Sequence, residues 1–178
     1  RIAVVDGLGH GPAAAEAARL ALEAVGKCLE EGVTEALSRC HAALAGTRGA
    51  ALTVAEVDVT RGVLTFSGVG NVEARVWRAE TPEKAERPIV YRGVVGATLP
   101  RLRSFELPLA GDWRLLVHTD GVSARWDVSR LEEGLSLQGM ADEVVERWGR
   151  VTDEATVVLA GPAGPAGPAG ETGPARGM

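Results

Sequence analysis

IAVVDGLGHGPAAAEAARLALEAVGK, residues 2–27, contains the transition that sets the architecture of this chain. Its first four residues are apolar and mostly β-branched, a pattern typical of a buried strand. Three glycines then predict a tight turn, and Pro12 stands at the first helical position, where its missing N–H costs nothing. From Ala13 to about Lys27, alanine-rich apolar positions recur at helical spacing. We therefore predict a strand, a turn and a helix that packs closely against a neighbouring layer.

The rest of the chain keeps its helices apart from its strands. Helices are predicted over residues 33–44 and 139–148, and an exposed loop over 79–88. Strands are predicted over residues 51–60, 63–69, 72–78, 89–91, 103–107, 114–118 and 155–160. Because these elements do not alternate as strand–helix–strand units, their order predicts an α+β fold. Two antiparallel sheets back to back, with the helices outside, are the economical arrangement.

Length and composition predict one folded domain and a short tail. The chain has 178 residues, of which 46% are hydrophobic, and this is enough to form a core. The last segment, GPAGPAGPAGETGPARGM at residues 161–178, has too few Gly-X-Y triplets to hold a collagen helix alone. We expect a domain at residues 1–160 and a disordered tail at 161–178. The chain enters a strand directly after Arg1, so a further strand is expected upstream.

Charge and cysteine usage exclude several classes of protein. The net charge of −5 argues against nucleic acid as a partner, and no apolar run is long enough to predict a membrane span. Cys28 and Cys40 form no CxxC motif, so we predict reduced thiols in a cytoplasmic protein. Separately, we expect the protein to be a monomer. An acidic chain needs a local cation to hold phosphate, for which Arg48 and the arginines in 101–103 are candidates.

Three aspartates carry the most specific chemistry in the sequence. Asp6 in VVDG, Asp120 in HTDGV and Asp153 in TDEAT each lie beside a predicted strand. If these strand ends meet, the carboxylates form a hard, oxygen-rich site that suits Mg²⁺ or Mn²⁺. A dinucleotide site is excluded, because the glycine spacing is G-x-G-x-G followed by proline and no second strand with an acidic end follows at the right distance.

Five motifs in a fixed order resemble those of a known family. They are VVDGLGHGPAAAEAA at 4–18, RGAAL at 48–52, SGVGNVEARV at 67–76, TDGV at 119–122 and DEATVV at 153–158. Together they resemble the PPM-type metal-dependent protein phosphatases. More narrowly, they are similar to the small bacterial SpoIIE/RsbX-like branch, which includes stressosome feedback phosphatases. The resemblance covers residues 1–160 and depends on several ordered motifs, where any single Asp-Gly pair would be weak.

The resemblance implies an α-β-β-α sandwich and a centre of two Mn²⁺ ions, with Mg²⁺ as the other possible ion. It implies that Asp6 bridges both metals, that Gly7 ligates one through its backbone carbonyl, and that Asp120 and Asp153 complete the other. These three aspartates are thus the predicted catalytic residues, acting through the metal-bound water. The implied reaction is hydrolysis of phosphoserine or phosphothreonine on STAS-domain proteins of a stressosome-like complex. The alternative is a catalytically weak, phosphatase-like domain that binds phosphoproteins as a regulator.

Several positions depart from the common pattern of the family or stay open. Leu8 replaces a histidine often proposed as general acid, Asn71 replaces an aspartate that supports a third metal, and Glu154 replaces a second aspartate. Asn71 either orients water near the metals or closes a tight strand connection. His10 either contacts substrate or faces solvent from its turn, and His118 is expected to pack behind the site instead of binding metal.

Overall fold

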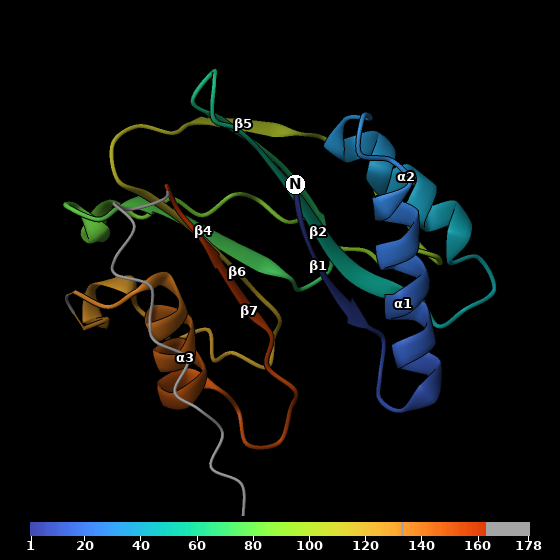
Figure 1. Cartoon of the computed structure of the whole chain (residues 1–178). Coiled ribbons are helices and arrows are strands. Elements are labelled where there is room, and N and C mark those ends of the chain that lie inside the picture. Colours follow the sequence, from blue (N-terminus) through green and yellow to red (C-terminus); the bar gives the residue numbers. More distant parts are fainter. Residues whose placement is uncertain (133, 163–178) are drawn as a thin grey trace, which may run out of the picture.

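The computed structural model describes residues 1–132 and 134–162. Two antiparallel sheets form its centre (Figure 1). The first sheet has, in spatial order, β1 (Ile2–Gly7), β2 (Ala50–Asp58), β3 (Val63–Val69) and β5 (Phe105–Pro108). The second sheet has β4 (Glu73–Arg78), β6 (Trp113–His118) and β7 (Val157–Ala160). The helical elements are α1 (Pro12–Gly26), α2 (Val33–Ala43), α3 (Leu137–Trp148) and the 3-10 turns η1 (Pro82–Lys84) and η2 (Val128–Arg130).

The elements stack as an α-β-β-α sandwich. Helices α1 and α2 lie against the first sheet, and α3 lies against the second (Figure 1). The predicted α+β fold is therefore confirmed, and the three predicted helices begin and end within two residues of their predicted bounds. Of the predicted tail, residues 163–178 lie outside the part of the chain that the structure describes.

Each boundary between layers has its own apolar core. Between the helices and the first sheet, Ala17 of α1 and Leu37 of α2 are fully buried. Between the sheets, Phe66 of β3 and Leu115 of β6 are fully buried. Between the second sheet and α3, Val144 is fully buried. Because β2 is covered on both faces, its first six residues are all buried, and alanines on α1 allow the helix to approach the sheet closely.

The chain passes from the first sheet to the second directly after β3. Gly70 has a φ of 102°, and a Cβ there would lie 2.4 Å from the Cβ of Ala51, so only glycine permits this crossing. The Thr53 hydroxyl donates a hydrogen bond of 2.7 Å to the carbonyl of Val72 and ties the two sheets together at this point. The strand predicted over residues 72–78 is therefore confirmed as β4, but it belongs to the other sheet from β3.

The strand predicted over residues 89–91 is wrong. Within this segment only Tyr91 forms a bridge, which is an isolated parallel pairing with Val69. The free edge of β3 is already occupied by β5, which pairs with it over Val63–Phe66. The rest of this edge, up to Val69, is short, and of residues 89–91 only Tyr91 pairs with it.

Membrane and thiol expectations can be compared with the described residues. In residues 1–132 and 134–162, no helix is both long and apolar enough to cross a bilayer. Cys28 and Cys40 are both buried free thiols. Burial raises the pKa of Cys40 to about 11, so this thiol stays protonated at neutral pH and is a poor nucleophile.

The packing between the sheets predicts a large loss of stability on truncation at Leu115. This side chain is fully buried, so Leu115→Ala is expected to lower the free energy of unfolding by about 2–5 kcal/mol. The matched control is Leu22→Ala on α1, because Leu22 is 50% exposed and its truncation is expected to cost less than about 0.5 kcal/mol. Urea denaturation followed by circular dichroism measures both. Equal losses for the two variants would contradict the assignment of Leu115 to the core.

Candidate metal centre

The structure brings the three predicted aspartates to one region from different elements. Asp6 is the penultimate residue of β1 in the first sheet. Asp120 follows β6, and Asp153 lies in the turn between α3 and β7, both beside the second sheet. The pKa of Asp6 is raised, first by partial burial and then by the negative charges of Asp120, Asp153 and Glu154. The sandwich thus places four carboxylates within electrostatic reach of one another.

A backbone clasp holds the Asp120 turn against the Asp153 turn. The Thr119 N–H donates to the carbonyl of Thr156 at 3.1 Å, and the Thr156 N–H donates to the Thr119 hydroxyl at 3.0 Å. The Arg150 N–H donates to the carbonyl of Gly121 at 2.7 Å. A Cβ on Gly121 would lie 2.2 Å from the carbonyl oxygen of Glu154. Because the two turns touch through their backbones, any residue larger than glycine would force them apart.

The turn after Asp6 is held by the residues before β2 and by the start of α1. The N–H of Leu8 donates to the carbonyl of Gly49 at 3.0 Å. A Cβ on Gly7 would lie 2.1 Å from the carbonyl oxygen of Ala14, so Gly7 is required where the helix lies over the end of β1. Arg48 lies over the same turn, because a Cβ on Gly9 would come within 2.7 Å of its Nη1. The carboxylate of Asp6 therefore has a candidate phosphate-binding arginine nearby.

Asn71 contacts Asp120 directly. Its side-chain amide donates a hydrogen bond to Oδ2 of Asp120. Of the two roles left open by the sequence, the structure supports a position beside the carboxylates. Asn71 lies in the segment that crosses from β3 to β4. The residue that orients the Asp120 carboxylate therefore comes from the connection between the two sheets.

His118 and Trp126 form a buried pair behind Asp120. The Trp126 Nε1–H donates to Nε2 of His118 at 2.9 Å, so the proton of the neutral imidazole is on Nδ1, which donates to the carbonyl of Thr119 at 2.9 Å. Burial lowers the pKa of His118, which keeps the ring neutral. His118 therefore supports the Asp120 turn, as expected, and both of its nitrogens are engaged. The sequence did not predict that Trp126 holds His118, because the two residues are eight positions apart and no local motif marks the pair.

The donor set fits a hard divalent cation, although the side chains are not gathered around a single point. In residues 1–132 and 134–162, no three His, Cys, Asp or Glu side chains are close enough to enclose an ion. The negative charges of Asp120, Asp153 and Glu154 nevertheless all raise the pKa of Asp6, so the four groups share one acidic region. Oxygen ligands with excess negative charge are what Mg²⁺ and Mn²⁺ prefer. His10 is exposed in the turn after β1 and is not one of these charged neighbours.

A sandwich of two antiparallel sheets with acidic turns at the strand ends is the arrangement found in solved structures of PP2C-type phosphatase domains. The model of the family described as Stage II sporulation protein E (SpoIIE) matches residues 1–161. The chain belongs to the SpoIIE family. The resemblance found in the five sequence motifs is thereby confirmed.

Solved structures give the same assignment of fold. One, described as "The bacterial stressosome: a modular system that has been adapted to control secondary messenger signaling", is 28% identical, with 88% of this chain and 81% of that chain covered and a TM-score of 0.79. RsbX in complex with magnesium is 23% identical, with 89% and 79% covered and a TM-score of 0.79. The Mycobacterium tuberculosis serine/threonine phosphatase PstP/Ppp is 14% identical, with 88% and 86% covered and a TM-score of 0.69. No curated protein matches the chain.

Gly121 provides a test of the clasp between the two acidic turns. Gly121→Ala is expected to lower the free energy of unfolding by about 1–3 kcal/mol, because its Cβ would collide with the backbone at Glu154. It is also expected to weaken Mn²⁺ binding, measured by calorimetry. The control is Gly26→Ala at the end of α1, where a Cβ would meet no atom within 4 Å and stability should change little. Native stability and Mn²⁺ affinity in Gly121→Ala would refute the clasp.

Asp6 provides a test of the repulsion among the carboxylates. The raised pKa means that ionised Asp6 destabilises the metal-free fold, and this cost grows as pH rises through the folded pKa. Asp6→Asn is therefore expected to raise Tm of the metal-free protein at neutral pH by up to about 2–4 °C, since partly exposed charges contribute less than about 1 kcal/mol. If the carboxylates bind Mn²⁺, added Mn²⁺ is expected to raise Tm of the wild type and to leave Tm of Asp6→Asn unchanged. The exposed Asp142→Asn on α3 serves as control, and calorimetry at pH 7 would disprove the repulsion if Asp6→Asn lowered Tm.

Proposed function

We propose that this chain is a Mn²⁺-dependent phosphatase that hydrolyses phosphoserine and phosphothreonine on STAS-domain proteins of a bacterial stressosome-like complex. The observation that carries the proposal is the placement of Asp6, Asp120 and Asp153 within electrostatic reach of one another, at the ends of strands of both sheets. Membership of the SpoIIE family supports the same reaction. We further propose that the chain acts as a monomer in the cytoplasm, with Mg²⁺ as an alternative ion.

Four groups are proposed to hold the two ions. Asp6 would contact both, the backbone carbonyl of Gly7 would contact one, and Asp120 and Asp153 would complete the other. When bound, such cations neutralise phosphoryl oxygens and lower the pKa of water, so that hydroxide is available at neutral pH to attack phosphorus. The proposed catalytic residues are therefore the three aspartates, and no side-chain nucleophile is needed.

Other residues of the chain are proposed to position these groups and the phosphate. Asn71 holds the carboxylate of Asp120 by its amide, and the neutral His118 supports the backbone of Thr119. Arg48 lies over the turn after Asp6 and is the nearby cation suited to a phosphoryl oxygen. Leu8 is 46% exposed in this turn and has no proton to give, so the leaving oxygen must be protonated by water or by another group.

The proposed substrate class follows from the structural relatives. RsbX and a structure described under the bacterial stressosome share the fold over most of both chains. A net charge of −5 is also better suited to a protein substrate than to nucleic acid. Phosphorylated STAS-domain proteins are therefore the substrates to test before other phosphoproteins.

Phosphate release from a phosphorylated STAS-domain protein tests the function directly. The wild type is expected to release phosphate with Mn²⁺ and to lose this activity with chelator. Asp120→Asn is expected to lower kcat by about 100-fold or more, because it removes a charged ligand and replaces the carboxylate that accepts from Asn71 by a neutral amide. Asp142→Asn, an equivalent change on the exposed face of α3, is expected to retain activity.

The outcomes separate the reaction from its substrate. Hydrolysis of unrelated phosphoserine proteins while STAS-domain proteins stay intact would refute the substrate and leave the phosphatase in place. No hydrolysis of any phosphoprotein by a folded protein that binds Mn²⁺ would refute catalysis and favour the regulator that only binds phosphoproteins.

A further inference from the structure

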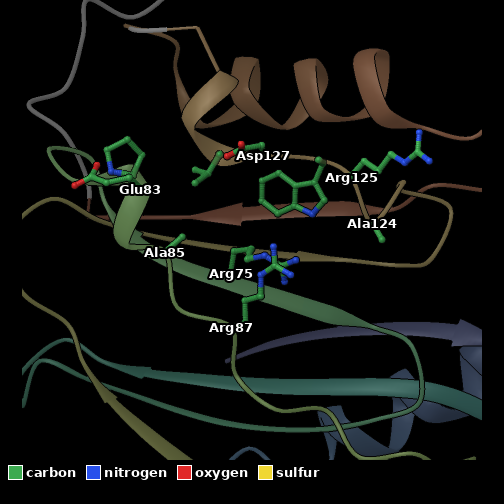
Figure 2. A pocket seen from close by; sticks show the side chains of 10 residues that line it. Arg75, Glu83, Ala85, Arg87, Ala124, Arg125 and Asp127 are labelled. Atoms are coloured by element: carbon green, nitrogen blue, oxygen red, sulfur yellow. The ribbon is translucent and has the colours of Figure 1, made fainter.

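A second polar hollow lies outside the candidate metal centre. Its volume is about 310 Å³, and it opens between the middle of β4, η1 and the segment that leads into η2 (Figure 2). None of the three candidate ligand aspartates lines it. Figure 2 shows Arg75 and Arg87 with their guanidinium groups together on one side and Asp127 on the facing side. We call this hollow the arginine pocket.

Arg75 forms the buried base of the arginine pocket. It lies on β4 and is only 4% exposed. Its Nη1 donates to the carbonyl of Ala74 at 2.9 Å and to Oε2 of Glu73 at 3.3 Å. Within residues 1–132 and 134–162, its Nε and Nη2 make no hydrogen bond, yet they are not fully enclosed. Two donors of a buried, charged side chain therefore remain for a group that enters the pocket.

The charges around Arg75 leave room for an anion. Burial lowers the pKa of Arg75, and the positive charge of Arg87 lowers it further. The carboxylate of Asp127 already accepts hydrogen bonds from the N–H and hydroxyl of Ser129, at 3.0 and 2.8 Å. Arg125 and Glu83 also line the pocket, but their charged groups point away from Arg75 and Arg87 (Figure 2). Arg75 and Arg87 thus face one acid across the pocket, Asp127, which is engaged with Ser129, while Glu73 pairs with Nη1 of Arg75 alone.

One side of the arginine pocket is formed by an aromatic ring. Cζ of Arg75 lies over the ring of Trp126, 5.5 Å from the ring centroid, in a cation–π contact. The indole N–H is engaged with His118, so Trp126 offers the pocket only its ring. An anion bound by the arginines would therefore have an apolar surface beside it, against which the organic part of a ligand can pack.

We propose that the arginine pocket binds the phosphate group of a phosphate monoester, with Arg75 and Arg87 as donors and Trp126 against the ester carbon. A guanidinium pair matches the several oxygens and double charge of phosphate better than the single charge of a carboxylate. The phosphate comes either from a small phosphorylated molecule or from a phosphorylated residue of a protein. The site goes beyond the proposed hydrolysis, because it shares no residue with the candidate ligands.

Binding is tested on metal-free full-length protein, so that neither hydrolysis nor a metal ion contributes. The probes are O-phosphoserine, a phosphoserine peptide and its unphosphorylated form, titrated by calorimetry. Both phosphorylated probes are expected to bind and the unphosphorylated peptide is not. Arg87→Gln is expected to weaken binding by about tenfold or more, the effect of losing one charge-assisted hydrogen bond. Because Arg87 is exposed, this variant should fold normally, whereas Arg75→Lys tests the base of the pocket and needs a parallel measurement of Tm.

Arg61→Gln in the exposed turn between β2 and β3 is the matched control and should bind like the wild type. Shifts of the arginine Nε–Hε resonances should be confined to the arginines of the pocket. Similar affinities for O-phosphoserine and the phosphopeptide would assign the site to small molecules, and tighter binding of the peptide would assign it to a protein. Absence of phosphate-dependent binding, or equal weakening by Arg87→Gln and Arg61→Gln, would overturn the proposal without affecting the test of hydrolysis.

Discussion

The apolar layer between the two sheets is the constraint on which the rest of the structure depends. Phe66 and Leu115 meet there without any exposure to water. Burial of this layer holds the end of β1 near the ends of β6 and β7, although the carboxylates at these ends repel one another. The hydrophobic effect is not directional, so it can hold such charges together where no pairing of charges would. The carboxylates of the candidate metal centre therefore stay close together because burial of the apolar layer outweighs their repulsion.

Repulsion at the strand ends is opposed locally by backbone contacts. The Thr119–Thr156 hydrogen bonds and the close approach of Gly121 to Glu154 leave the two turns little freedom to separate. Gly7 gives the same close approach between β1 and α1. These contacts use main-chain atoms and the Thr119 hydroxyl, so none of them occupies a carboxylate oxygen. A cation would convert their mutual repulsion into attraction, so metal binding and stability are expected to be coupled.

The Trp126–His118 pair connects the two sites of the molecule. Trp126 forms a wall of the arginine pocket and donates to His118, which in turn donates to the backbone directly before Asp120. The ring of His118 is buried and neutral, so this connection is a fixed hydrogen-bonded support at neutral pH. A ligand against Trp126 would therefore lie two side chains away from a candidate metal ligand.

The fold class, the helices, most of the strands and the three aspartates could all be predicted from the amino-acid sequence. These are local features: apolar periodicity, glycine turns and short motifs in fixed order, each visible within a few residues. Only the tertiary structure decided that β4 joins the second sheet, that residues 89–91 form no strand and that Asn71 reaches Asp120. It alone also revealed the arginine pocket, whose residues come from β4, η1 and the approach to η2. Such features depend on which surfaces pack together, and packing joins residues whose separation along the chain carries no periodic signal.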